Sequence, residues 1–313
     1  MILEITEHGS SLARKNESFV ITHGGEKKEI PAVKLDAIVI SCNAAISTAA
    51  IRLCLEKSIQ LVIADGTGMP LGRFWHSTLG KHTELRRRQY LAQETPLANR
   101  IARRILEAKL REQKRLLSDL KNNRSAATPE LSAALSVLEQ TLTTLERTPS
   151  LTKQAMLGLE GNASSAYLAA IASLLPPFYR FQTRSQHPAR DPFNALLNYA
   201  YGIGYREVES VAIISGLDPN AGFYHSDQYN KPTLSFDLIE LFRPKIDRLC
   251  ISLVTKRLAR EKWFTSSDGT WSLTQEGRRA VIAAYYDRIH RPIASECWAF
   301  CRWIIEELMG NAD

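Results

Sequence analysis

The pattern of hydrophobic and polar positions changes its period near residue 80. Before that point apolar and polar residues alternate in short runs, which predicts strands over 2–6, 18–22 and 37–41 and one helix over 47–57. From about residue 82 onward the pattern is helical almost throughout. The 313 residues are enough for two domains. We therefore expect an α+β protein with a small N-terminal β-rich domain (1–78), a linker (79–88) and a larger all-α C-terminal domain (89–313).

A strand followed by several glycines occupies residues 59–73, an arrangement that also opens dinucleotide-binding loops. The glycines at 66, 68 and 72 do not follow the G-x-G-x-x-G spacing. Pro70 is followed by Leu-Gly-Arg-Phe-Trp, which is typical of a return strand and not of a helix. The sequence therefore favours a β-hairpin over a nucleotide loop.

The N-terminus and the cysteines indicate the compartment. The first residues alternate apolar and polar side chains and include acids, so they lack the basic and apolar regions of a signal peptide. No apolar run reaches the roughly 18 residues that span a bilayer. The five cysteines are an odd number and widely spread, and are most simply reduced, buried thiols. We expect a cytoplasmic protein with no membrane partner.

Glu160 lies on the apolar face of a predicted helix over 153–174. At helical spacing it falls on one stripe with Met156, Ala163, Tyr167 and Ala170. An unpaired buried carboxylate is costly, so Glu160 must be neutral, paired with Lys or Arg, or bound to a metal. For an isolated Glu of this kind, an internal salt bridge is the more common outcome.

Three further candidates, His225, Asp237 and Glu240, lie within sixteen residues of one another. Asp237 and Glu240 are three residues apart, so a helix would place both carboxylates on one face. Together with Glu160 they form a hard set of donors, mostly oxygen with one imidazole, which suits Mg²⁺ or Mn²⁺.

Each of these three residues also has an ordinary structural explanation. A lone His is often structural. Asp237 could be a first-turn acid behind a Ser235 N-cap. Glu240 is embedded among apolar residues and could pair with Arg243 or Arg248. The four candidates gain weight only if one fold brings them together.

Positive charge is concentrated in one segment. The net charge is +7, and residues 81–124 contain thirteen Lys or Arg against five Asp or Glu, so the rest of the chain is near neutral. A solvated surface helix would also show basic residues at helical spacing. The alternative is a footprint for a phosphate backbone. Because the excess is localised and accompanies a candidate metal site, we favour nucleic-acid binding, with these candidate contacts: Arg86, Arg87, Arg88, Arg100, Arg104 and Arg111.

Four sequence blocks follow one another along the chain: Glu160-Gly161 with Tyr167 downstream, Asp191-Pro-Phe-Asn194, Gly216-Leu-Asp-Pro219 with Gly222-Phe-Tyr-His225, and Asp237-Leu-Ile-Glu240-Leu-Phe-Arg-Pro244. In this order they resemble the motifs of CRISPR-associated protein 1, the endonuclease and integrase that installs new spacers in CRISPR arrays. The resemblance covers most of the chain, and four ordered blocks are far more specific than one. It implies an N-terminal β domain that mediates dimerisation and a helical catalytic domain that holds the metal.

The resemblance also implies a reaction and partners. Glu160, His225 and Glu240 would bind Mg²⁺ or Mn²⁺, with Asp237 close by in a supporting or alternative catalytic role; many relatives carry Asp at the position of Glu240. The free 3′-OH of a spacer precursor would attack the repeat backbone by transesterification, and attack by water would give nicking. The implied partners are spacer-precursor DNA, the CRISPR repeat, a second copy of this chain, and a small second CRISPR-associated protein, in a heterohexameric integration complex.

Two other functions stay open. A transposon-type integrase of the same fold would share the site but act on terminal inverted repeats. A non-catalytic DNA-binding scaffold would use the carboxylates only to satisfy arginines. A metal titration distinguishes the scaffold from both enzymes.

Overall fold

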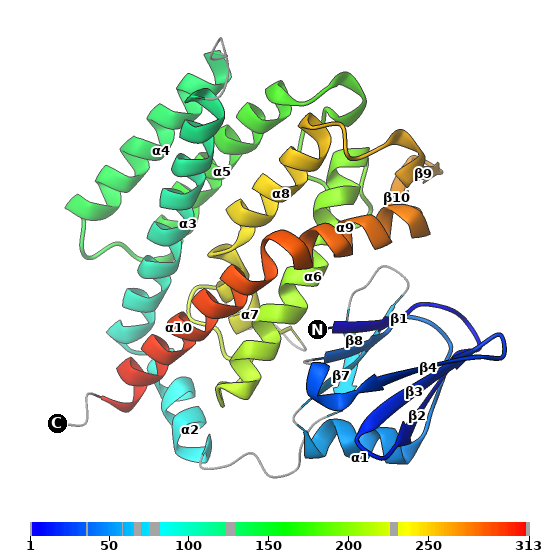
Figure 1. Ribbon diagram of the computed structural model, residues 1–313. Coiled ribbons are helices and arrows are strands. Elements are labelled where there is room, and N and C mark those ends of the chain that lie inside the picture. The colour runs from blue at the N-terminus through cyan, green and yellow to red at the C-terminus, as the bar shows by residue number, and fades with distance from the viewer. Residues whose placement is uncertain are drawn as a thin grey trace. The chain divides into compact units, whose positions relative to one another are not determined.

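The computed structural model of the chain describes residues 2–35, 37–57, 59–65, 70–74, 82–122, 129–225 and 231–310. The chain forms two compact units, Met1–Gly80 and Lys81–Asp313 (Figure 1). The first is rich in strands and the second is mostly helical, so the predicted α+β class is confirmed. Within the described ranges, no helix is both long and apolar enough to cross a membrane.

The described elements of the N-terminal unit form two sheets with one α-helix. Their bounds are β1 (Ile2–Ile5), β2 (Ser11–Lys15), β3 (Ser18–His23), β4 (Glu26–Pro31), η1 (Ala32–Lys34), β5 (Ala37–Ile40), β6 (Ala45–Ile46), α1 (Thr48–Glu56), β7 (Gln60–Ala64) and β8 (Pro70–Phe74). One sheet has the order β1-β5-β7-β8 and the other β4-β3-β2-β6. Leu12, Phe19, Ile38 and Leu53 belong to the core of this unit.

Strands β1, β5 and β7 are parallel, and β8 returns antiparallel to β7. This pairing confirms the hairpin that the sequence predicts in place of a nucleotide loop; the turn residues 66–69 lie outside the described residues. The helix predicted over 47–57 is confirmed as α1, and it is capped by Ser47, whose hydroxyl accepts the N–H of Ala50 at 3.2 Å.

The C-terminal unit is built mainly from helices. Its described elements are α2 (His82–Ala92), α3 (Pro96–Asn122), α4 (Pro129–Arg147), α5 (Lys153–Leu174), η2 (Pro177–Tyr179), α6 (Pro192–Ile214), α7 (Thr233–Glu240), α8 (Arg243–Thr255), η3 (Glu261–Trp263), β9 (Phe264–Ser267), β10 (Thr270–Leu273), α9 (Gln275–Arg288) and α10 (His290–Met309). Helices α3, α4 and α5 lie side by side, and α6 contacts α7, α8, α9 and α10 (Figure 1). Gly204 of α6 permits this packing, since a Cβ there would lie 2.7 Å from Ile246 and 2.9 Å from Ile239.

Helix α2 begins inside the range 79–88 that the sequence assigns to a linker. Leu85, Gln89 and Ala92 recur at helical spacing, and all three are buried. Three consecutive arginines at 86–88 interrupt this stripe and give it the composition of a linker. Burial of the stripe makes residues 82–88 the first turns of the helical unit.

The five cysteines are free thiols, as the sequence predicts. Four of them are buried, and only Cys42 is partly exposed. Burial raises the pKa of the Cys54 thiol to about 11, so it stays protonated at neutral pH.

Candidate active site

Helix α5 presents Glu160 from an otherwise apolar stripe. Met156, Ala163 and Tyr167 of this stripe are buried, as predicted, and the Glu160 side chain is 17% exposed. Oε2 of Glu160 accepts a hydrogen bond from the hydroxyl of Tyr224 at 3.0 Å. Oε1 contacts the ammonium of Lys109. Of the three states that the sequence allows for this carboxylate, the structure shows the ion pair.

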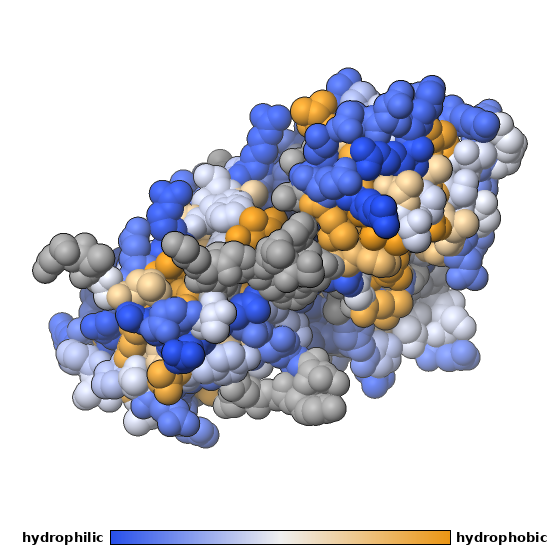
Figure 2. All heavy atoms as spheres, turned by 90° about the horizontal axis from the view of Figure 1, so that it is seen from below, coloured by the Kyte–Doolittle hydropathy of each residue, from blue (hydrophilic) through white to orange (hydrophobic). Residues whose placement is uncertain are grey.

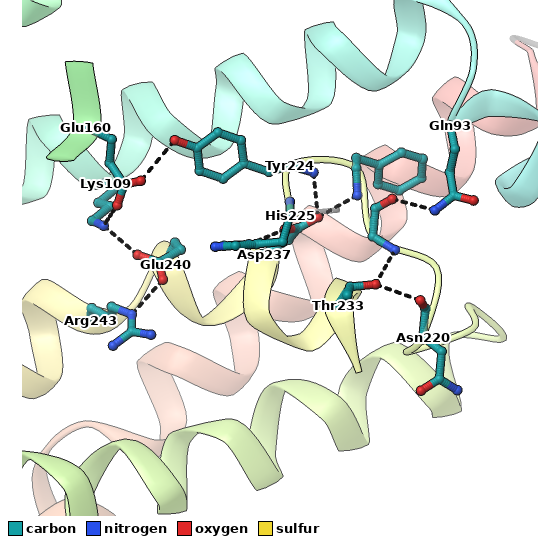
Figure 3. Close-up of polar contacts among 12 residues, drawn as sticks. Gln93, Lys109, Glu160, Asn220, Tyr224, His225, Thr233, Asp237, Glu240 and Arg243 are labelled. Atoms are coloured by element: carbon teal, nitrogen blue, oxygen red, sulfur yellow. Dashed lines mark hydrogen bonds and ion pairs between the residues drawn. The ribbon is translucent and has the colours of Figure 1, made fainter. Parts of the chain in front are cut away.

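Lys109 is the residue of this site that the sequence analysis missed. It lies on the buried stripe of α3 with Ile105 and Gln113, and its side chain is only 6% exposed. Its ammonium contacts Glu160 and lies 2.6 Å from Oε2 of Glu240 (Figure 3). Burial disfavours the charged form, but the two carboxylates outweigh it and raise the pKa of Lys109 above its ordinary value. The sequence signal was a lysine inside an apolar stripe, where a charge must be paired.

Asp237 holds the turn that carries His225. Its carboxylate is fully buried and accepts three backbone N–H groups, from Phe223 at 2.5 Å, Tyr224 at 2.8 Å and His225 at 2.9 Å. Gly222 permits this close approach, since a Cβ there would lie 3.0 Å from Asp237 Oδ2 and 2.8 Å from the backbone of α7. The carboxylate therefore acts as a template for the turn.

The predicted Ser235 N-cap is wrong. Helix α7 begins at Thr233, directly after Pro232, so Ser235 and Asp237 both lie inside the helix. The hydroxyl of Thr233 donates to the carbonyl of Asn220 at 2.6 Å and accepts the N–H of Gly222 at 2.9 Å. The start of the helix is therefore fixed by these contacts with a distant turn, and not by the local preference for Ser at an N-cap.

Asp237 also orients the imidazole of His225. Nδ1 lies 2.7 Å from Oδ1 of Asp237, which assigns the proton to Nδ1 and leaves Nε2 as the nitrogen with a lone pair. Figure 3 shows the ring extending from Asp237 toward Glu240. Burial alone would lower the pKa of His225, but the hydrogen bond and charge of Asp237 outweigh it and raise this pKa above its ordinary value.

Glu240 is fixed by cations on both of its oxygens. Nε of Arg243 donates to Oε1 at 2.7 Å, which is one of the two ion pairs that the sequence allows, whereas Arg248 pairs with Asp119 instead. Arg243 is itself held, since it donates to the hydroxyl of Tyr205 at 2.8 Å. Burial disfavours the charged form of Glu240, but Arg243 and Lys109 outweigh it and hold the pKa of this carboxyl at about 2.

The donor set suits a hard divalent cation. Two carboxylates from different helices meet at one buried ammonium, with His225 beside them (Figure 3). Oε2 of Glu240 lies 2.6 Å from the ammonium of Lys109, so the cation that this oxygen meets is supplied by the chain itself. Among the described residues no three His, Cys, Asp or Glu side chains stand close enough to hold an ion as they are placed. Metal binding by Glu160, His225 and Glu240 thus stays a prediction.

The sequence matches a protein family that is already known. A family model described as CRISPR associated protein Cas1 matches residues 3–287. The chain belongs to the Cas1 family. A CRISPR-associated endonuclease Cas1 from Archaeoglobus fulgidus is 30% identical over 305 residues, which cover 92% of this chain and 88% of the relative. The family that the sequence resembles is therefore confirmed.

Two solved structures show the same fold as this Cas1 chain. A Cas1 protein from Thermotoga maritima superimposes with a TM-score of 0.84 at 22% identity, covering 99% of this chain and 97% of the other. A casposase bound to integration product superimposes with a TM-score of 0.81 at 21% identity, covering 98% and 91%. At these identities the similarity establishes the fold, and the site must be argued from its own residues.

Two of the arginines predicted to contact DNA tie helix α2 to the rest of the Cas1 helical unit. Arg86 donates to the carbonyl of Gly216 at 3.2 Å, and Arg88 donates to the carbonyl of Met309 at 2.8 Å. Both side chains therefore have a structural contact in addition to any role in DNA binding.

The other four predicted arginines lie on the surface and make weak contacts there: Arg87 with Glu84, Arg100 with Glu307, Arg104 over the ring of Trp303, and Arg111 with Glu146. Exposed ion pairs contribute little to stability, so a phosphate can replace the carboxylate beside Arg87, Arg100 or Arg111 at little cost, whereas Arg104 rests on an aromatic ring. Contact of any of the six with DNA stays a prediction. The loop around Tyr229, between His225 and α7, lies outside the described residues.

Proposed function

We propose that this Cas1 chain is a metal-dependent DNA endonuclease and integrase of CRISPR spacer acquisition, which joins the 3′-OH ends of spacer DNA to the CRISPR repeat. Membership in the Cas1 family supports the CRISPR setting. The observation that carries the chemistry is the meeting of Glu160 and Glu240, from different helices, at one buried cation beside His225.

The proposed reaction is a transesterification that conserves the number of phosphodiester bonds. The spacer 3′-OH loses its proton to solvent and its oxygen bonds to a repeat phosphorus. The bond from that phosphorus to the leaving 3′-oxygen breaks, and this oxygen takes up a proton to become a free 3′-OH. Bound by Glu160, His225 and Glu240, Mg²⁺ or Mn²⁺ would polarise the phosphodiester and lower the pKa of the attacking hydroxyl. With water as the nucleophile, the same exchange of bonds gives a nick.

The chain's own contacts prepare these side chains for that role. Asp237 holds the His225 ring so that Nε2 is the ligating nitrogen, which makes Asp237 a positioning residue. Tyr224 and Arg243 each fix one oxygen of Glu160 and Glu240, respectively, and leave the other oxygen directed at the cation. These contacts fix the orientation of each side chain before DNA binds.

Strand transfer tests the proposal. A fluorescent duplex with free 3′-OH ends is incubated with a supercoiled plasmid that carries a leader and repeat, with Mg²⁺ or Mn²⁺ and the small second CRISPR-associated protein. We expect joined product from the wild type and from Glu139→Gln, an exposed control, and none from Glu160→Gln or His225→Ala. Joining that persists in Glu160→Gln would refute the assignment of the site.

We also propose a homodimer formed through the N-terminal unit, acting with DNA and the small second protein. The edge strand β8 exposes Leu71 at 70% and Phe74 at 41%, and an exposed apolar edge is usually covered. Figure 2 shows a face on which polar residues predominate and apolar residues gather in smaller patches. Light scattering after size exclusion tests this part: Leu71→Lys should lower the molar mass from that of a dimer to that of a monomer.

A transposon-type integrase is the second candidate. The chain shares its fold with a casposase, and this fold does not distinguish the two DNA targets. Replacing the leader and repeat by terminal inverted repeats in the strand-transfer assay separates the two enzymes. Binding of DNA without any metal-dependent joining or nicking would favour the scaffold.

A further inference from the structure

The two carboxylates of the site share one arrangement around Lys109. Oε2 of Glu160 accepts the hydrogen bond of the Tyr224 hydroxyl, and Oε1 contacts the ammonium of Lys109. Glu240 places Oε1 on Arg243 and Oε2 on the same ammonium. Each carboxylate therefore has one oxygen on a fixed structural partner and turns the other to a common point. That common point holds a positive charge supplied by the chain itself.

We infer that the ammonium of Lys109 occupies the cation position of this site, and that a divalent ion binds by displacing it. This inference rests on the proposed metal-dependent function and adds that a side chain of the protein competes with the metal ion for its ligands. The inward oxygens of Glu160 and Glu240 are the ligands that the ion needs, and the ammonium already contacts both. One point between two carboxylates cannot hold both cations, because their charges repel at contact distance.

The competition has two consequences. Without metal, Lys109 compensates two carboxylates that would otherwise be buried near each other, so the site is stable when empty of metal. When a metal ion binds, its binding free energy is reduced by the attraction between Lys109 and the two carboxylates, because that attraction is lost on displacement. Metal affinity is therefore lower than the carboxylates alone would give, and removing the ammonium should raise it.

Manganese binding to purified full-length protein tests the inference without any readout of activity. Free Mn²⁺ is measured by electron paramagnetic resonance for wild type, Lys109→Met, Lys109→Arg and Lys114→Met. Lys114 is a matched control because it lies on the same helix and makes an exposed ion pair with Glu139. We expect at least tenfold tighter binding by Lys109→Met, and no tightening by Lys109→Arg or Lys114→Met. Equal or weaker binding by a folded Lys109→Met would overturn the inference.

A measurement on the wild type covers the case in which Lys109→Met does not fold. In protein labelled with ¹⁵N-lysine, the buried and ion-paired ammonium of Lys109 should give a protected NMR signal, assigned by its loss in Lys109→Arg. Titration with Mg²⁺ should shift or remove this signal at the concentration that fills the site. A signal that stays unchanged at saturation contradicts displacement.

Strand transfer by the same preparations separates this inference from the proposed function. If Lys109→Met binds Mn²⁺ more tightly but the wild type joins no DNA, the competition stands and the integrase function fails. If the wild type joins DNA while the variant shows unchanged Mn²⁺ affinity, the function stands and the competition fails.

Discussion

Replacing Asp237 by Asn tests whether one buried carboxylate shapes the turn of His225. In the wild type Oδ2 accepts the N–H groups of Phe223 and Tyr224, and Oδ1 accepts the N–H of His225 and contacts its Nδ1. An amide has one oxygen, so its NH₂ group must face two of these partners, and two hydrogen bonds to a charged acceptor are lost or inverted. Such bonds contribute about 1.5–3 kcal/mol each, so the free energy of unfolding should fall by about 3–6 kcal/mol.

Urea denaturation of metal-free protein measures this loss as a shift of the midpoint at unchanged slope. The matched control is Asp287→Asn, whose side chain is 80% exposed and which should change the free energy by no more than about 0.5 kcal/mol. NMR of the imidazole nitrogens gives a second readout, because the amide of Asp237→Asn should donate to Nδ1 and move the ring proton to Nε2. A loss of stability no larger than that of the control, with Nδ1 still protonated, would refute the template role of Asp237.

Three further predictions concern stability, pH and DNA. Gln89 is fully buried and makes three hydrogen bonds to the turn before His225. At about 1 kcal/mol per bond, Gln89→Leu should lower the free energy of unfolding by about 3 kcal/mol, whereas the same substitution at the exposed Gln140 should not lower it. The pKa of Glu240 in the folded protein lies below its ordinary value, so the contribution of this carboxylate to stability is present above about pH 4.5 and is lost as the pH falls toward 2. The difference in free energy of unfolding between wild type and Glu240→Gln should therefore shrink as the pH falls through that window, and a constant difference would contradict the ion pairs. Charge reversal at Arg100, Arg104 and Arg111 should weaken DNA binding and reduce the salt dependence of its affinity, with folding unchanged. An unaltered salt dependence would mean that this helix face is an ordinary solvated surface.

The sequence predicted the candidate carboxylates because their signal is local. Glu160 stands inside one apolar stripe and Glu240 inside another, and a charge in such a place must be compensated wherever the chain folds. The four-block resemblance then assigned them, with His225 and Asp237, to one site. The structure brings the helices that carry Glu160 and Glu240 together at Lys109, and places Asp237 against His225.

The parts that escaped prediction depend on partners far away in the chain. Lys109 is separated from Glu160 by 51 residues, and it looked like one more member of a basic run. Gln89 lies 129 residues from Asp218, whose backbone it holds, so nothing in its neighbourhood marks it. The false Ser235 cap has the same origin, because the start of α7 is fixed by the contact of Thr233 with a distant turn. Local rules describe what a residue needs, and only the tertiary fold shows what meets that need.

The charges of the site also relate metal binding to DNA binding. Glu160, Asp237 and Glu240 supply three negative charges, and Lys109 and Arg243 supply two positive ones, with one more on the imidazole when it is protonated. The raised pKa of that imidazole therefore lets the metal-free site approach neutrality. Ligation of a divalent ion requires the imidazole to be neutral, and the ion together with Arg243 then balances the three carboxylates, so the displaced ammonium of Lys109 is left without its counter-charge. A DNA phosphodiester can supply that counter-charge, so metal and DNA should each bind more tightly in the presence of the other.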